Sequence, residues 1–185
     1  MRKLKLQAQT SIDGYVGGPN GELDFMTWNW SDDIKKYVND LHETIDTILL
    51  GRKMTDGFVG HWAGVLNNPE DPSYAFAKVM IDTPKVVFTK TLEKSEWINT
   101  TLAKGDLTEE VNKLKQQDGK DLIVYGGASF DAALIKAGLI DELHLFVNPS
   151  SVGKGLPIFT EKATYKLADA KAFECGIVVL VYKPA

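Results

Sequence analysis

The periodicity of hydrophobic and polar positions changes several times along the chain, which predicts strands and helices in alternation. Period-two alternation over residues 4–10 predicts a first strand. Apolar residues at helical spacing over 34–45, preceded by the favourable N-cap residue Ser31, predict the first helix. Residues 47–50 then predict a short buried strand that runs directly into Gly51.

The remaining sequence repeats this alternation. Strands are predicted at 85–89, 122–125 and 143–147, helices from Met54 or Thr55, at 107–117 and from Ser129 to Gly138, a loop at 60–73, and final strands near 165–174 and 177–182. Alternating strands and helices predict an α/β fold with a mostly parallel sheet, covered on both faces and closed by an antiparallel ending. No internal repeat or linker interrupts the pattern, so residues 1–185 are predicted to form a single domain.

Composition and charge narrow the functional classes. The chain is 44% hydrophobic and 25% charged, as in soluble globular proteins, and its net charge of −4 argues against a general nucleic-acid-binding protein. No apolar run is long enough to cross a membrane and the N-terminus lacks the apolar stretch of a signal peptide, so a cytoplasmic location is expected. Cys175 is the single cysteine, and no Cys/His cluster has the spacing of metal ligands, so no metal site is expected.

The glycine pair Gly126–Gly127 is the strongest candidate for a binding site. It follows a buried strand and leads into a helix that starts with Ala128, Ser129 and Phe130. Glycines let a phosphate approach the backbone, and the free N–H groups of the following helical turn favour an anion. A tight strand-to-helix turn without a ligand is the alternative.

Two further strand ends carry groups that favour anions. Gly51 is followed by Arg52 and Lys53, and a later strand ends in Thr89 and Lys90. A guanidinium group binds phosphate through its planar fork and an ammonium group binds it as a point charge, although a solvated basic turn is the alternative. Ligands of open α/β sheets bind outside the carboxyl ends of the strands, so the three strand ends together predict a phosphorylated ligand.

Other chemistries are disfavoured. The run from Gly127 to Asp131 lacks the last glycine of a nucleophile elbow, and the chain contains neither a P-loop nor a G-x-G-x-x-G fingerprint. His42, His61 and His144 are scattered in the sequence, and each is interpreted as structural or solvated.

The ordered set of motifs resembles the dihydrofolate reductase superfamily. The motifs that carry the resemblance are Ser11–Gly14 after the first strand, Leu49–Lys53, Val87–Lys90 and Val124–Gly127. The later run Gly138–Leu143, followed by Pro149 and Gly153–Gly155, is similar to one branch, which holds the reductase domain of bifunctional riboflavin-biosynthesis enzymes and its small stand-alone relatives. The resemblance covers nearly the whole chain.

The resemblance implies a dihydrofolate-reductase-like three-layer fold with a mixed, mostly parallel eight-stranded sheet and antiparallel C-terminal strands. It also implies NADPH as the cofactor and a homodimer, with the antiparallel tail strands or their neighbours as the interface. Arg52 and Lys53 would contact the adenosine 2′-phosphate and the pyrophosphate, with Thr89 and Lys90 near the adenosine. The further cofactor-binding positions that it implies are Gly51, the pyrophosphate turn formed by Gly126, Gly127, Ala128, Ser129 and Phe130, and the nicotinamide border formed by Gln9, Val16 and Gly17.

The resemblance leaves two candidates for the catalytic acid. Asp33 occupies the position of the carboxylate that binds the pterin in dihydrofolate reductases, but an ordinary helix-start acid is an equal interpretation. Asp13, in the loop near the expected nicotinamide, is the other candidate, and its structural alternative is an Asx turn before Gly14. Trp28 is a candidate substrate-binding residue with Asp33, and Trp30 is a second aromatic that would wall the pocket, although large aromatics are more often in the core.

The resemblance therefore implies an NADPH-dependent reductase that transfers hydride to a small nitrogen heterocycle, a pterin or an aminopyrimidine relative. A second enzymatic interpretation is reduction of the ribosylated aminopyrimidinone of riboflavin synthesis. The alternative from another class is a non-catalytic nucleotide-binding module on the same fold.

Overall fold

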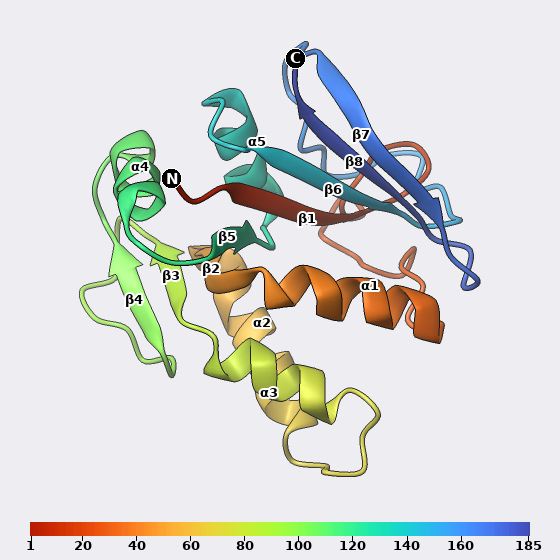
Figure 1. Cartoon of the computed structure of the whole chain (residues 1–185), viewed down its shortest axis with the longest axis horizontal. Helices are drawn as coiled ribbons and strands as arrows, with labels where there is room; N and C mark the ends of the chain where they lie inside the picture. Colours follow the sequence, from red (N-terminus) through yellow and green to blue (C-terminus); the bar gives the residue numbers. More distant parts are fainter.

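The computed structural model describes all 185 residues, which form a three-layer α/β fold around one eight-stranded sheet (Figure 1). The strands are β1 (Leu4–Thr10), β2 (Ile45–Gly51), β3 (Lys85–Phe88), β4 (Thr100–Ala103), β5 (Asp121–Val124), β6 (Glu142–Val147), β7 (Tyr165–Ala172) and β8 (Val178–Pro184). The helices are α1 (Asp32–Glu43), α2 (Arg52–Val65), α3 (Tyr74–Asp82), α4 (Leu107–Gln116) and α5 (Ala128–Lys136). No helix is both long and apolar enough to span a membrane.

The strand order confirms the predicted sheet. The order is β4-β3-β2-β5-β1-β6-β8-β7, in which all pairs from β4 to β6 are parallel and the pairs that β8 makes with β6 and β7 are antiparallel. The centre of the sheet is buried on both faces, because helices pack on each face of β2, β5 and β1. The carboxyl ends of the parallel strands consequently share one edge.

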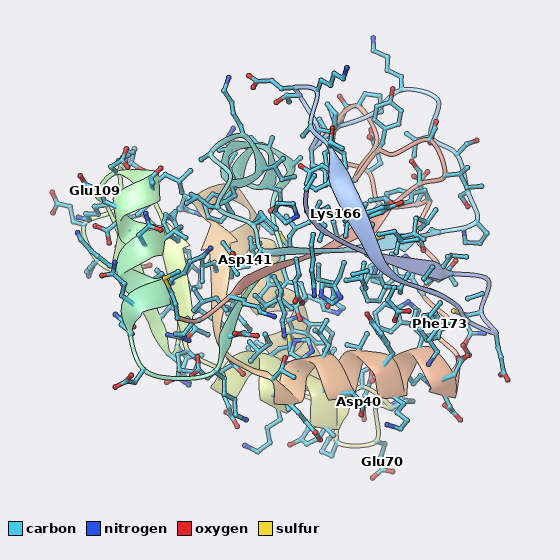
Figure 2. The ribbon with its side chains drawn as sticks, turned by 45° about the horizontal axis from the view of Figure 1, so that its top comes forward. Asp40, Glu70, Glu109, Asp141, Lys166 and Phe173 are labelled. Atoms are coloured by element: carbon cyan, nitrogen blue, oxygen red, sulfur yellow. The ribbon has the colours of Figure 1, made fainter.

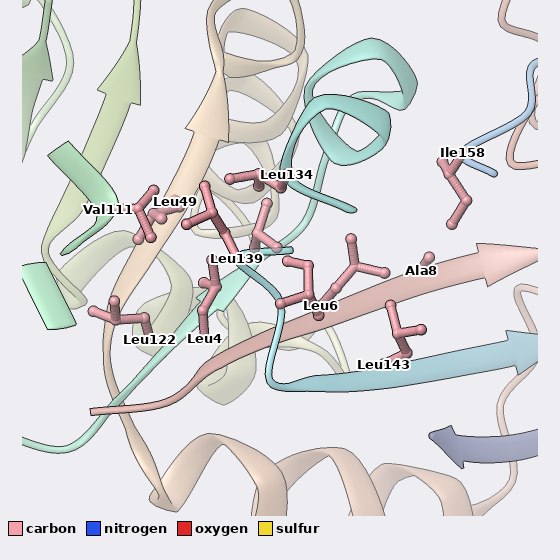
Figure 3. Packing of buried hydrophobic residues seen from close by; sticks show 12 residues of the cluster. Leu4, Leu6, Ala8, Leu49, Val111, Leu122, Leu134, Leu139, Leu143 and Ile158 are labelled. Atoms are coloured by element: carbon pink, nitrogen blue, oxygen red, sulfur yellow. The ribbon is translucent and has the colours of Figure 1, made fainter. Parts of the chain in front are cut away.

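The core is divided by the sheet. On one face, α4 and α5 bury Val111 and Leu134 against Leu4, Leu6 and Leu49 of the central strands (Figure 3). On the other face, helices α1, α2 and α3 cover β2, β3 and β5, and α1 also covers β6 and β8 (Figure 1). The periodicity in the sequence thus reports real buried faces.

The middle of the chain differs from the prediction. The expected loop at 60–73 is wrong over its first residues, because α2 begins at Arg52 and continues to Val65. Helix α3 and strand β4 were not predicted. Helix α3 has nine residues, too short for a clear periodic signal, and it is held by burial of Ala77, Met80 and Ile81. Strand β4 is short and polar, and it exists because it pairs with β3.

Asn148, directly after β6, fixes the loops at the carboxyl edge of β1 and β6. Its side chain is fully buried, and its amide nitrogen donates to Gln9 Oε1, Thr10 O and Phe146 O at 2.9, 3.2 and 3.0 Å. Its amide oxygen accepts the N–H of Thr27 at 2.8 Å. One side chain therefore ties β1, β6 and the segment before α1 together.

We expect Asn148→Ala to destabilise the protein by about 3 kcal/mol, because it leaves several buried backbone and side-chain groups without partners. Urea unfolding checks this value. Ser151→Ala, at an exposed position in the same loop, is the matched control and should change stability by less than about 0.5 kcal/mol. Equal stability of the two variants would contradict the assigned role of Asn148.

Candidate active site

Three strand ends that carry the predicted anion-binding residues meet along one edge of the sheet. Strands β3, β2 and β5 are neighbours and parallel, so Thr89, Arg52 and Gly126 follow adjacent carboxyl ends (Figure 1). The structure brings these residues to a common rim, and the ends of β1 and β6 continue the same rim on the other side of β5.

The end of β2 is in direct contact with the glycine turn. The Gly51 N–H donates to Gly126 O at 2.9 Å. A Cβ atom at Gly51 would lie 2.9 Å from Phe130 Cβ and 3.5 Å from Gly127 N, so no side chain fits there. The Phe130 ring also packs on Phe88 at the end of β3, with ring centroids 5.0 Å apart. Glycine at position 51 therefore allows the end of β2 to pack closely against Phe130 and the glycine turn.

The Gly126–Gly127 turn exposes backbone donors. Gly126 has a φ of +113°, which favours glycine, and its peptide bond to Gly127 is cis. The N–H groups of Gly126 and Gly127 donate to no protein acceptor. Helix α5 begins at Ala128, so the N–H groups of Ala128 and Ser129 lie in its first turn and lack intrahelical partners. This arrangement of donors at a helix N-terminus is suited to a phosphate group.

Arg52 is held by two neighbours. Its guanidinium forms an ion pair with Asp56 at 2.9 Å and lies 5.2 Å from the centre of the Trp97 ring. Trp97 Nε1 donates to the second oxygen of Asp56 at 3.1 Å. The hydrogen bond from Arg52 lowers the pKa of Asp56. Lys53 is exposed and forms no ion pair, so it remains a free cation beside Arg52.

Thr89 and Lys90 are engaged in the turn after β3. Thr89 Oγ1 accepts the N–H groups of Thr91 and Leu92, each at 3.2 Å. Lys90 Nζ donates to the carbonyl oxygens of Lys104 and Gly105 at 3.1 and 2.5 Å. Both residues lie at the rim, but their polar groups already form hydrogen bonds within the protein.

Of the residues predicted to border the nicotinamide, Gln9 lies near the end of β1, and Val16 and Gly17 lie in the loop that follows β1. Val16 N donates to Leu156 O at 3.0 Å, and Leu156 N donates to Gly17 O at 2.9 Å. A Cβ atom at Gly155 would lie 2.1 Å from Gly17 O, so glycine is required for this contact. Gln9 is tied to Asn148, as described above. The two loops form one substructure at the β1–β6 end of the rim.

The Asp13 side chain links two loops by hydrogen bonds. Its carboxylate accepts the N–H groups of Val152 and Gly153 at 3.0 and 2.7 Å. Hydrogen bonds from the Ser11 hydroxyl and from these N–H groups lower the pKa of Asp13 to about 2. The side chain is exposed and ionised, and it joins the two loops.

Asp33 has a similar role at the start of α1. It accepts the hydroxyl of Ser31 at 2.5 Å and the N–H groups of Ile34 and Glu174 at 2.8 and 3.1 Å. The Ser31 hydroxyl is the main cause that lowers its pKa. These contacts tie α1 to the turn between β7 and β8, and both oxygens have partners.

The tryptophans separate into different environments. Trp28 is 64% exposed, so it is available to a ligand at the surface. Trp30 stacks on Phe146 with ring centroids 6.3 Å apart and belongs to the core under α1.

The sequence analysis missed one carboxyl group at the glycine turn, that of Asp131. Asp131 is 3% exposed, and its Oδ1 atom is buried without a hydrogen-bond partner. A Cβ atom at Gly126 would lie 3.0 Å from Asp131 Oδ2, so the carboxyl group lies directly against the turn. Burial raises the pKa of Asp131 to about 8. Its position three residues before Leu134, on the buried face of α5, is the signal that could have revealed it.

The buried histidines belong to the other face of the sheet. His144 Nδ1 lies 3.1 Å from the Tyr37 hydroxyl and Nε2 lies 3.4 Å from Glu142, and His42 bonds to Tyr125 and to Val38 O. Burial lowers the pKa of His42. No three His, Cys, Asp or Glu side chains group as metal ligands.

Comparison with known proteins shows the family of the chain and its fold. Residues 2–181 match the family described as the RibD C-terminal domain. Two curated relatives come from Bacillus subtilis (strain 168): the uncharacterized protein YyaP is 35% identical and covers 98% of this chain and 94% of its own, and the uncharacterized protein YwjB is 25% identical and covers 93% and 92%.

Solved structures share the fold. A putative riboflavin biosynthesis protein from Shewanella sp. PV-4 superposes with a TM-score of 0.72 at 20% identity, over 99% of both chains. A diaminohydroxyphosphoribosylaminopyrimidine deaminase/5-amino-6-(5-phosphoribosylamino)uracil reductase from Thermotoga maritima superposes with a TM-score of 0.68 at 16% identity, over 100% of this chain and 57% of the other. The expected eight-stranded fold with antiparallel C-terminal strands is thus confirmed.

We expect Asp131→Asn to stabilise the protein at neutral pH. The folded-state pKa of about 8 lies above the value of 3.8 for an unperturbed carboxyl, so the stability that the group contributes is present below pH 3.8 and is lost as pH rises to 8. The asparagine variant has no such loss, and its free energy of unfolding at pH 7 should exceed that of the wild type by on the order of 2 kcal/mol. Thermal unfolding at pH 4 and pH 7 checks this: a gain of equal size at both values would refute the assignment.

Proposed function

Because this chain belongs to the RibD C-terminal domain family, we propose that it is an NADPH-dependent reductase acting on a small nitrogen heterocycle. The family and its structural neighbours support a reductase-like role. NADPH as the cofactor, and a pterin or an aminopyrimidine as the substrate class, are the finer parts of the proposal. We place the reaction in the cytoplasm.

One observation carries the proposal: the donor-rich turn at Gly126–Gly127. Its unbonded N–H groups, followed by the N-terminus of α5, fit a pyrophosphate that is cradled by Gly126 through Phe130. Arg52 and Lys53, one strand away, fit the 2′-phosphate. The Trp97 ring, which lies 5.2 Å from the Arg52 guanidinium, would stack on the adenosine at the same place. Thr89 and Lys90 would lie near the adenosine, in the turn after β3.

Bound NADPH would supply the hydride, and the protein would orient the two reactants. Gln9, Val16 and Gly17 would border the nicotinamide, since Gln9 lies near the end of β1, the strand beside β5, and Val16 and Gly17 lie in the loop that follows β1. Trp28 is exposed beside Thr27, which Asn148 holds at this end of the rim, and would stack on a planar heterocycle. Asp33 and Asp13 remain candidate acids of the proposal.

A non-catalytic NADPH-binding module is the second candidate function, and a specific observation favours it. Every oxygen of Asp13 and Asp33 accepts at least one hydrogen bond from the loops, and hydrogen bonds lower the pKa of both groups. Low-pKa carboxylates are poor proton donors at neutral pH.

Absorbance at 340 nm separates the two functions. NADPH oxidation is measured with dihydrofolate, with aminopyrimidinones that do and do not carry a ribosyl phosphate, and with no substrate. Turnover on a heterocycle supports the reductase. Tight NADPH binding in calorimetry without turnover on any of these compounds supports the binding module, and absence of NADPH binding refutes both.

We expect Arg52→Ala combined with Lys53→Ala to weaken NADPH binding by about 100-fold, because two cations facing the 2′-phosphate are lost. The affinity for NADH, which lacks that phosphate, should fall by less than about fivefold. Calorimetric titration with both nucleotides provides the comparison, and Lys36→Ala on the exposed face of α1 is the control. Equal losses for the two nucleotides would show that these cations do not bind the 2′-phosphate.

We also propose that the chain forms a homodimer through the free edge of β7. This strand pairs with β8 alone, and its residues from Lys166 to Ala172 are exposed. Figure 1 shows β7 at the outer edge of the sheet beside β8, and Lys166 is labelled on this strand in Figure 2. Beside it, Leu143, Leu145, Phe159, Tyr165 and Tyr182 line an apolar depression of about 370 Å³. An exposed edge next to an apolar hollow is an unpaired surface that proteins usually cover.

The charges along β7 favour a second copy as the partner. Asp169 and Lys171 flank Ala170 on one face, since they lie opposite Val181 and Val179 of β8. An antiparallel copy centred on Ala170 would place Asp169 of one protomer opposite the partner's Lys171, twice by symmetry.

Charge exchange tests this interface. Asp169→Lys and Lys171→Asp should each weaken the dimer by about 30-fold, because each turns two attractive pairs into repulsive ones. The combined variant, Asp169→Lys with Lys171→Asp, should restore the dimer. Sedimentation velocity gives the dissociation constants. A monomeric wild type, or a double variant as weak as the single ones, would rule out this register.

A further inference from the structure

Asp131 lies where its charge would oppose the ligand of the glycine turn. Its carboxyl group and the Met54 sulfur fill the space on the inner side of Gly126, at 3.0 and 3.3 Å from the position of a Cβ atom there. The N–H groups of Gly126 and Gly127, in the same turn, donate to no protein acceptor. A phosphate held by these donors would thus lie at the same turn as the Asp131 carboxyl group, which is buried and directly against Gly126.

No neighbouring cation neutralises this carboxyl group. The elements that meet at it are α5, the glycine turn and the first turn of α2. On α5, Lys136 pairs with Glu161. On α2, Arg52 pairs with Asp56, and Lys53 is exposed. No ion pair or hydrogen bond joins any of these groups to Asp131, and its Oδ1 atom has no partner at all.

An ionised carboxylate in this position would repel a phosphate across a medium of low permittivity, where water does not screen the two charges. A neutral carboxyl group of the same shape supports the turn without that repulsion. Burial raises the pKa of Asp131 to about 8, so the neutral form predominates at neutral pH.

We propose that the glycine turn binds a phosphate group only while Asp131 is neutral, so that this residue controls the affinity of the site for a phosphorylated ligand. The inference rests on the proposed function, in which the turn holds the pyrophosphate of NADPH. It assigns Asp131 a positioning role: the residue supports the turn from within and does not touch the ligand.

The sign of the pH dependence follows from the linkage between proton and ligand. The ligand binds the protonated form, so the apparent dissociation constant equals the intrinsic one divided by the protonated fraction. With a pKa of about 8, the protonated fraction falls to about one tenth at pH 9. Affinity should therefore fall about tenfold between pH 7 and pH 9. The last ionisation of a phosphate monoester, near pH 6, lies below this window.

Calorimetric titration with NADPH at pH 7, 8 and 9 tests the inference on three proteins. The wild type should lose about tenfold in affinity over this range, whereas Asp131→Asn, which is nearly isosteric and always neutral, should lose less than twofold. Asp40→Asn, which removes an exposed carboxylate from α1, is the matched control and should behave like the wild type. All three proteins keep Arg52, Lys53 and Lys90, so titration of these cations cancels in the comparison.

A second measurement does not depend on affinity. The ¹³C shift of the Asp131 carboxyl carbon should titrate far above the ordinary range for aspartate in the free protein, and its midpoint should move higher when NADPH is bound. Asp131→Ser provides another neutral side chain if the asparagine variant does not fold.

The outcomes are distinct. Parallel pH profiles for the wild type and both neutral variants, with NADPH bound at pH 7, would overturn the role of Asp131 and leave the cofactor assignment intact. No NADPH binding at pH 7 by any of the proteins would overturn the proposed function, and this inference with it.

Discussion

The contact between the end of β2 and the turn after β5 is the constraint on which the site depends. The Gly51 N–H bonds to Gly126 O, and the Phe130 side chain occupies the space that any side chain at position 51 would need. Because of this approach, Arg52 and the N-terminus of α5 start from neighbouring points. The close packing of two glycine-containing strand ends thus produces both the cationic and the backbone-donor part of the rim.

Many polar groups around this rim already serve the fold. Thr89, Lys90, Asp13 and Asp33 each bond to backbone groups of nearby loops, and Asn148 alone bonds to four partners. The groups without partners are therefore the informative ones. They are the N–H groups of the glycine turn, the exposed Lys53 and the buried carboxyl group of Asp131, and all lie near the α5 N-terminus.

The two faces of the sheet differ in how they accommodate buried polar groups. The face under α1 contains buried polar pairs, such as His144 with Tyr37, that close on themselves and stabilise the packing of the helix. The face under α5 is apolar, so the carboxyl group of Asp131 finds no partner there. An unpaired acid in an apolar layer is tolerated only in its neutral form, which links the composition of this layer to the chemistry proposed for the turn.

The sequence by itself determined the elements with strong periodicity and the residues that end the central strands. The alternation over residues 4–10 and the glycines that follow the buried strands can be read along the chain, although the alternation does not show that the structure also buries the polar residues Lys5 and Gln7. Helix α3 and strand β4 could not be read, because both are short and are held by neighbours distant in sequence.

Only the tertiary structure decided which polar groups have partners. Asp33 and Asp131 both look like acids in a first helical turn, and although the spacing to Leu134 places Asp131 on a buried face, the chain does not show whether a donor meets either carboxylate. The fold bonds Asp33 to the backbone beside Glu174 and encloses Asp131 against Gly126 without any donor. Solvation and hydrogen bonding are set by segments far apart in sequence, and for that reason the protonation state of an acid belongs to the folded protein and not to its motif.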